Sequence, residues 1–269
     1  MTEQIVPATD RVLRNRVSLR TTLSNSLTMA YRNLLLIRRT PQQLFDVTIQ
    51  PILFTLMFTF LFGGAISGSV SSYLPIIVPG ILVQTALTAT MATGVQLRED
   101  MDRGVFYRFK SMPIARISPL TGPLLADLVR YSIATVLTFV MGYLLGFRWA
   151  SPQAAMAAGI LVVFCSWCIS WIFALLGVVA KTAQTVQGIS TAILFPLVFL
   201  SGAFVPTNTL PWWLQDFVNV NPLTYIVSAV RELLNSGIVG TDFWLSLIGS
   251  VVVVIVFAPL TLRVYMRKA

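Results

Sequence analysis

Six long apolar stretches dominate this sequence, and each is long enough to cross a lipid bilayer as a helix. A crossing takes about 20 mostly apolar residues, and such stretches cover Leu44–Phe62, Leu74–Val95, Leu120–Phe147, Ala154–Ala180, Gln184–Phe204 and Phe243–Leu262. Only 11% of residues are charged and 56% are hydrophobic, a balance that would leave a soluble domain with large exposed apolar patches. The sequence therefore predicts an all-α membrane protein with six transmembrane helices, and excludes a disordered chain, a small disulfide scaffold and a soluble nucleic-acid binder.

The basic residues predict the orientation of these spans. Sixteen of the 19 Lys and Arg residues lie before the first span, in the second and fourth connections, or after the last span. Only Arg148 and Arg231 lie on the opposite side, and Arg130 lies within a span. Because Lys and Arg accumulate in cytoplasmic loops, both termini are predicted to be cytoplasmic, as an even number of spans requires. No cleavable signal peptide is expected.

The segment before the first span divides into two parts. Residues 1–17 are polar and rich in arginine, and we expect them to be flexible. Residues 18–40 are predicted to form a basic amphipathic helix, because Leu19, Leu23, Leu27 and Leu34 recur at spacings of three and four. Such a helix is typical of the cytoplasmic membrane interface. The alternative is a soluble helix that packs on the protein itself.

Several kinds of chemistry are absent from the sequence. There is no His, so catalysis or metal binding by His is excluded, and Cys165 and Cys168 lie in an apolar run with no charged partner. These two cysteines are interpreted as small buried hydrophobic residues. The phosphate-binding pattern G-x-x-x-x-G-K-[ST] is also missing. The chain is therefore predicted not to be an enzyme and to bind no metal and no cofactor of its own.

Two connections carry an unusual composition. The cytoplasmic segment 96–116, QLREDMDRGVFYRFKSMPIAR, mixes charges with aromatic residues, a composition suited to docking another protein, although an ordinary solvated loop is the alternative. On the outer side, residues 206–242 contain Trp212, Trp213 and Tyr225, and such side chains favour a membrane interface. We predict two short helices here, Pro211–Val218 and Pro222–Asn235, separated at Asn221-Pro222. They either take part in transport or form a simple interfacial cap.

These two connections resemble those of one family, the membrane (permease) subunits of type-2 ATP-binding-cassette exporters, or ABC-2 permeases. One match is Arg98-Glu99, Gly104 and Met112-Pro113. The second match lies between the fifth and sixth spans, and consists of Gly202–Pro206, Leu210-Pro211, Trp213-Leu214, Asn221–Tyr225 and Arg231. The resemblance covers about residues 18–265, with 41–265 as the six-helix domain. Within the family, the chain looks closest to daunorubicin-resistance-type exporters of drugs or lipids.

The resemblance implies a function and partners. The chain would be the permease of an ATP-driven exporter in a bacterial cytoplasmic membrane, and would move an amphipathic drug, lipid or lipid-linked molecule outward. Two copies of a cytoplasmic ABC ATPase would bind ATP and Mg²⁺, on a dimer formed with a second copy or a paralogue. Membrane lipid is the other expected partner, and nucleic acid is not.

Candidate site residues follow from that expectation. The ATPase-coupling residues would be Arg98, Glu99, Gly104, Phe106, Tyr107, Phe109, Met112 and Pro113. A substrate path at the dimer interface would be lined by Asp46, Gln50, Gln84, Gln184 and Gln187. The outer hairpin would close the exit through Pro206, Pro211, Trp212, Trp213, Asn221, Pro222, Tyr225 and Arg231.

Three charged residues inside the spans leave alternatives open. Asp127 and Arg130 are three residues apart near the predicted cytoplasmic end of the third span, so they are able to pair on one helix face. The pair is interpreted either as an anchor near the headgroups or as part of substrate binding or coupling. Asp46 is likewise either an interface anchor or a group that lines the path.

Three other kinds of function stay open as rivals. A polysaccharide exporter has the same layout, whereas a secondary transporter usually carries acidic residues or His deep in the membrane. The third is an assembly subunit without transport. An intramembrane enzyme is disfavoured, because the sequence offers no combination of nucleophile and base.

Overall fold

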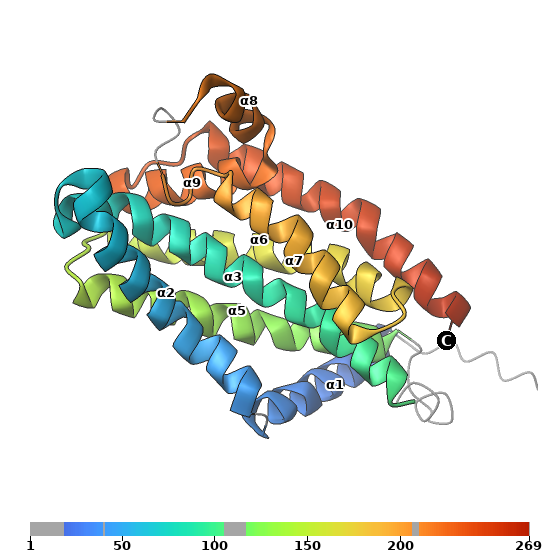
Figure 1. Cartoon of the computed structure of the whole chain (residues 1–269). Coiled ribbons are helices and arrows are strands. Elements are labelled where there is room, and N and C mark those ends of the chain that lie inside the picture. Colours follow the sequence, from blue (N-terminus) through green and yellow to red (C-terminus); the bar gives the residue numbers. More distant parts are fainter. Residues whose placement is uncertain (1–18, 40, 105–116, 206–209, 269) are drawn as a thin grey trace, which may run out of the picture.

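The structure is a computed structural model, and it describes residues 19–39, 41–104, 117–205 and 210–268. In these ranges the chain is helical and has no strand, as the sequence predicted. The helices are α1 (Leu19–Arg39), α2 (Pro41–Ser67), α3 (Val70–Asp102), α5 (Ser118–Leu144), α6 (Pro152–Val179), α7 (Ala183–Phe199), α8 (Trp212–Val220), α9 (Pro222–Ser236) and α10 (Thr241–Lys268). The long helices lie side by side in one elongated bundle, with α8 at one tip and α1 near the other (Figure 1).

Five of the six predicted spans correspond to helices long and apolar enough to cross a membrane, namely α2, α3, α5, α6 and α10. The fifth predicted span, Gln184–Phe204, is only partly helical, because α7 ends at Phe199 after 17 residues. The chain turns at Gly202, whose φ of 69° favours glycine. The residues that follow α7 stay buried without being helical, so the length criterion alone does not establish a sixth crossing.

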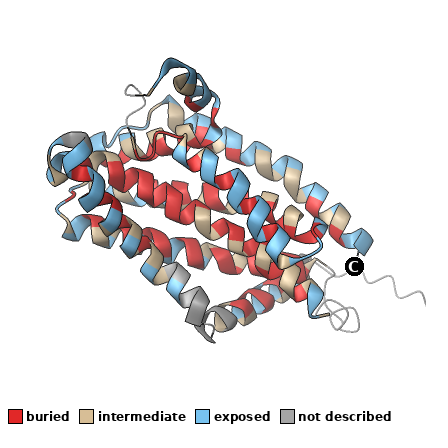
Figure 2. Cartoon of the chain, viewed as in Figure 1, coloured by how far each residue is buried: buried red, intermediate tan, exposed pale blue. Residues whose placement is uncertain are grey.

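Helix α3 lies at the centre of the bundle, where Figure 2 shows mostly buried positions. It packs against α2, α5, α6, α7 and α9. Small residues allow its close approach to α6. A Cβ atom added at Gly177 would overlap the backbone of Gly94, and one added at Gly94 would overlap the carbonyl of Phe173. Such contacts between small residues are a common way for membrane helices to pack.

Hydrogen bonds between distant segments define the two ends of the bundle. At the α1 end, Lys268 Nζ donates to the carbonyl of Val178 at 2.8 Å, and Arg98 Nη1 donates to that of Ala180 at 2.9 Å. At the α8 end, the amide of Ala150 donates to the carbonyl of Leu234 at 2.8 Å. The α1 end therefore holds the last residues of α3, α6 and α10 together.

The connection between the second and third predicted spans differs from its prediction. The sequence placed a loop from residue 96, but α3 stays helical to Asp102. Two ion pairs, Arg98–Asp102 and Glu99–Arg103, stabilise this extension, and each joins residues one helical turn apart. Gly104, with a φ of 66°, then allows the chain to leave the helix. Residues 105–116 lie outside the described residues.

Helix α1 packs on α5 with a face different from its apolar stripe. Ser26 and Met29 are buried, and Ser26 Oγ lies 2.8 Å from Thr121 Oγ1. Leu23, Leu27 and Tyr31 instead point outward and are more than 60% exposed. The helix thus contacts the protein through Ser26, Met29 and Ala30, and Leu23 and Leu27 of its predicted apolar stripe lie on the free side.

The segment between the fifth and sixth predicted spans contains two helices close to those predicted. Helices α8 and α9 are separated at Asn221, and Pro222 occupies the first turn of α9. A proline is tolerated there because the first amides of a helix have no partner within it. The Asn221 side chain caps α9 by accepting from the amide of Leu223 at 3.0 Å.

Candidate functional site

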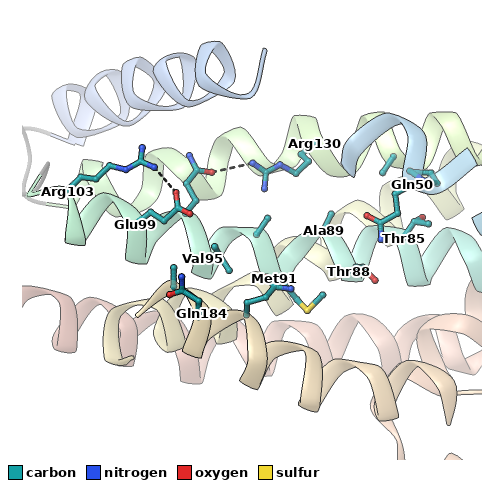
Figure 3. Close-up of a pocket in the computed structure, with 16 residues that line it drawn as sticks. Gln50, Thr85, Thr88, Ala89, Met91, Val95, Glu99, Arg103, Arg130 and Gln184 are labelled. Carbon is teal, nitrogen blue, oxygen red and sulfur yellow. Dashed lines mark hydrogen bonds and ion pairs between the residues drawn. The ribbon is translucent and has the colours of Figure 1, made fainter. Parts of the chain in front are cut away.

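A cavity of about 800 Å³ lies between α2, α3, α5 and α7, and reaches toward the α1 end (Figure 3). Its wall mixes polar and apolar side chains. The polar ones are Gln50, Thr85, Thr88, Gln96, Glu99, Arg103, Arg130, Gln184 and Gln187, and the apolar ones include Pro51, Met91 and Val95. A cavity of this size accommodates a drug-sized molecule, and the mixed wall suits an amphipathic one.

The structure brings three of the five predicted path residues to this cavity. Gln50 comes from α2, and Gln184 and Gln187 come from α7. Gln84 is buried in α3 and is not among the residues that line the cavity, although it lies one helical turn before Thr88, which does. The Asp46 side chain lies outside the described residues. The path role of all five stays a prediction.

Most of the polar wall comes from α3, from which the sequence had predicted only Gln84 for the path and Arg98 and Glu99 for coupling. Thr85, Thr88, Gln96, Glu99 and Arg103 all line the cavity. Their separations are close to multiples of the helical repeat, so they lie on one side of α3. This periodicity is visible in the sequence. The prediction, however, divided this stretch at residue 96 into an apolar span and a loop, so these polar residues were not grouped on one helix face.

The charged residues of the third span lie beside the cavity. Arg130 Nη1 is 3.1 Å from Asp127 Oδ1, and the two side chains are only 4% and 1% exposed. Asp127 lies nine residues after Ser118, about 14 Å along the axis of α5. The pair is therefore enclosed by α3 rather than exposed at the end of its helix, which disfavours the interpretation as a headgroup anchor.

A buried polar network extends from this ion pair in two directions. Thr93 donates to Asp127 Oδ2 and lies 3.1 Å from the hydroxyl of Tyr131. On the other side, Arg130 Nη2 donates to Gln96 Oε1 at 3.3 Å (Figure 3). Gln96 Nε2 in turn donates to Asn33 Oδ1 at 3.1 Å. The network therefore joins α1, α3 and α5 beside the cavity.

The predicted coupling residues are only partly described. Glu99 lines the cavity and pairs with Arg103 at 3.2 Å, whereas Arg98 turns toward the end of α6. Gly104 ends α3. The other five residues lie outside the described residues, and they are Phe106, Tyr107, Phe109, Met112 and Pro113. Contact with an ATPase stays a prediction for the whole set.

At the α8 end, side chains of the predicted hairpin bind the backbone of the last turn of α7 and of the residues that follow it. Asn221 Nδ2 donates to the carbonyls of Leu197 and Leu200 at 2.7 and 2.8 Å. Arg231 Nη2 donates to the carbonyl of Gly202 at 2.8 Å, and the hydroxyl of Tyr73 donates to that of Phe204 at 2.7 Å. These bonds satisfy backbone groups that have no helical partner, which a buried non-helical segment in a membrane requires.

The remaining residues of the predicted hairpin have different surroundings. Trp212 and Trp213 are 77% and 58% exposed on α8, next to the exposed Pro211. Tyr225 donates to the carbonyl of Asn219 at 2.9 Å. Pro206 lies outside the described residues. Tyr73, which was not among the predicted site residues, also bonds the backbone after α7. Burial lowers the pKa of the Arg231 guanidinium, since a low-dielectric environment disfavours the charged form.

A family model described as "ABC-2 type transporter" matches residues 25–235, which is most of the chain. The chain belongs to this family. The match includes the cavity, the ion pair and the helices of the α8 end. The resemblance inferred from the two connecting segments is therefore confirmed.

The relatives of this ABC-2 chain include permeases named for drug resistance. The daunorubicin resistance ABC transporter permease protein DrrB1 of Streptomyces coeruleorubidus is 40% identical over 249 residues, which cover 92% of this chain and 88% of that protein. A probable doxorubicin resistance ABC transporter permease protein DrrC of Mycobacterium tuberculosis is 27% identical over 60% of this chain and 58% of that protein. A putative transport permease of Cyanophora paradoxa is 26% identical over 73% and 69%. The chain is a multi-pass membrane permease of the ABC transporter type.

Proposed function

We propose that this permease exports an amphipathic drug or lipid, and that a separate cytoplasmic ABC ATPase supplies the energy. The cavity is the observation that carries the proposal. It has the volume of a drug-sized ligand, and amide, hydroxyl and apolar groups share its wall. The similarity to a daunorubicin resistance permease over most of both chains supports a drug as the substrate.

The α1 end is the proposed site of ATPase binding. Basic side chains gather there, including Arg98, Arg103, Lys181 and Arg267, whereas Arg148 and Arg231 are the basic residues of the α8 end. This distribution supports a cytoplasmic location for the α1 end and for both termini. The ATPase would contact residues 96–116 and α1, and thereby be coupled to α3 and the cavity.

A second permease would cover the free face of α7. Gln184, Thr185, Gln187 and Thr191 are exposed there, and nothing lies within 4 Å of a Cβ added at Gly188. Polar side chains are unfavourable against lipid, and small residues allow close helix contacts. Because α7 also lines the cavity, a dimer through this face would place the transport path at or beside the interface. The partner in that dimer is a second copy or a paralogue.

The test is reconstitution of the permease with a candidate ATPase in lipid nanodiscs. We expect the two proteins to purify together and ATP turnover to rise when daunorubicin is added. Glu99→Ala and Phe106→Ala should weaken ATPase binding or abolish that stimulation. Failure of the wild-type permease to bind any candidate ATPase in several lipids would contradict the exporter function, and binding without stimulation by daunorubicin would contradict the drug as substrate.

A further inference from the structure

The cavity has an accessible negative charge toward its α1 end. Glu99 lines the wall, and its side chain is 43% exposed. It is the one acidic residue among the cavity-lining residues that the structure describes. Its carboxylate accepts a hydrogen bond from Arg103, with 3.2 Å between Oε2 and Nη2 (Figure 3). A ligand in the cavity is therefore able to contact this carboxylate without entering the packed core.

The partner of Glu99 is held weakly. Arg103 lies one helical turn further toward the α1 end, just after α3, and its side chain is 70% exposed. An exposed ion pair within one helix contributes little to stability, because water and salt weaken the attraction. The exposed guanidinium keeps its hydration when it turns away. A cation of the ligand is therefore able to replace Arg103 beside Glu99 and to leave no buried charge unpaired.

The exposed fractions of the two side chains favour a cation over an anion as the ligand group. An anion bound to Arg103 would leave Glu99, the more enclosed of the two, without its partner. A cation bound to Glu99 leaves only the more exposed Arg103 without one. The other arginine of the wall, Arg130, does not change this balance, because it is 4% exposed and lies 3.1 Å from the carboxylate of Asp127. That pair is closed within the protein.

The rest of the wall along α3 suits the uncharged part of an amphipathic molecule. Thr85 lies 14 residues before Glu99, about 21 Å along the helix axis, and both residues line the cavity. Between them, Met91 and Val95 offer apolar surface and Thr88 offers a hydroxyl group. The accessible charge is thus at one end of a long and mostly uncharged wall, which matches a molecule with a charged group at one end.

We propose that Glu99 binds the ammonium group of an amphipathic amine, and that the uncharged part of this molecule extends along α3 toward Thr85. This inference rests on the proposed function and deepens it, because it assigns a positive charge to one end of the substrate. It gives Glu99 a role within the permease besides its predicted contact with the ATPase. A drug amine and the ethanolamine headgroup of a lipid have the same chemistry, so the experiment must separate these two sources.

The experiment measures binding of daunorubicin, which carries a primary amine, to the full-length permease in phosphatidylcholine nanodiscs without an ATPase. Quenching of the drug's fluorescence reports binding, after correction for partition into empty nanodiscs. Glu99→Gln keeps the size of the side chain but removes its charge, and we expect the affinity to fall about 10-fold. Glu232→Gln is the matched control, because Glu232 is an exposed residue of α9 that does not line the cavity. We expect this control to bind as the wild type does.

A second variant separates substrate binding from a structural role of the ion pair. Arg103→Gln removes the competing partner of Glu99, so we expect the affinity for daunorubicin to rise about 3-fold. If the ion pair only supported the structure, its loss in either variant would change the affinity in the same direction. A fall in both variants, or unchanged affinity in a folded Glu99→Gln variant, overturns the role of Glu99 and leaves the exporter function intact.

Variation of the ligand tests the same contact without a mutation. N-acetyldaunorubicin has the same rings but no positive charge, so it should bind the wild type about 10-fold more weakly than daunorubicin. The two compounds should bind the Glu99→Gln variant equally. Equal affinity for the wild type overturns the proposal even if Glu99→Gln fails to fold. No binding of either compound overturns the drug as substrate, and the inference with it.

Added phosphatidylethanolamine identifies the source of the amine once binding has been shown to depend on Glu99. If this lipid weakens daunorubicin binding to the wild type but not to Glu99→Gln, the lipid amine binds the same carboxylate. That result supports the assigned chemistry with lipid as a second source. If daunorubicin binding is unchanged, the result supports the drug amine as the group that Glu99 binds.

Discussion

The two ends of the bundle hold their polar groups in different ways. At the α8 end, Tyr73, Asn221 and Arg231 bond backbone carbonyls at 2.7 to 3.3 Å. Beside the cavity, side chains bond other side chains, from the short Thr93–Asp127 bond to the Asn33–Gln96–Arg130 chain at 3.1 to 3.3 Å. Among the described residues, Nε and Nη1 of Arg130 and Nε of Arg231 have no hydrogen-bond partner. Backbone carbonyls have fixed positions, whereas side chains are able to change partners. The α8 end is thus bonded to backbone and the cavity wall to side chains, and we expect the α8 end to be the more rigid of the two.

The largest effect is expected from Gly80→Ala at the α8 end. An added Cβ would overlap the carbonyl of Ala203, which is backbone and cannot turn away. We expect a loss of about 3 kcal/mol in the free energy of unfolding, measured by denaturant titration in detergent. Gly188→Ala is the control, since nothing lies within 4 Å of its Cβ. Equal stability of the two variants would contradict the tight closure of this end.

A smaller loss is expected when the hydrogen bonds of this end are removed without a steric clash. Arg231→Met deletes the donors to the carbonyls of Gly202 and Ile76. Because these two carbonyls then lack a hydrogen-bond donor, the free energy of unfolding should fall by about 2 kcal/mol. Tyr73→Phe removes only the bond to Phe204, and about 1 kcal/mol is expected in the same titration. If both variants were as stable as the wild type, water would be replacing these bonds.

Gln96→Leu tests the cavity side of the comparison. It removes the acceptor of Arg130 and the donor to Asn33, and since both bonds are long, we expect only about 1 kcal/mol of destabilisation. Drug-stimulated ATP turnover should fall much more, because the link between α1 and α5 is lost. Gln153→Leu is the matched control, as Gln153 is exposed in the first turn of α6 and does not line the cavity. The same fall in turnover in both variants would argue against the network.

The smallest effect is expected from Arg103→Gln. Arg103 is 70% exposed and its ion pair with Glu99 is within one helix, so the change in the free energy of unfolding should stay within about 0.5 kcal/mol. ATPase binding at the α1 end is the more sensitive measurement. A stability loss above 1 kcal/mol would show that this pair is less solvated than its exposure indicates.

The sequence by itself determined the helical class, the approximate position of each long helix and the break at Asn221-Pro222. Apolar length and proline position act locally, so one sequence is sufficient to recognise them. The two connections that carry the family resemblance were also identified from the sequence, and the family model matches both of them. The end of α7 was not predictable, since hydropathy continues to Phe204 while Gly202 and the bonds from Asn221 and Arg231 end the helix.

Only the tertiary structure decided which polar residues meet. Gln50 and Gln184 are far apart in sequence and share a cavity, whereas Gln84 was predicted to line the same path and is buried outside the cavity wall. The spacing of Asp127 and Arg130 predicted that they pair. How deeply the pair is buried, and which hydrogen bonds Arg130 makes among the described residues, depends on how α3 and α5 pack. Spacing along a helix determines which face a side chain occupies, and the packing of several helices determines what that face meets.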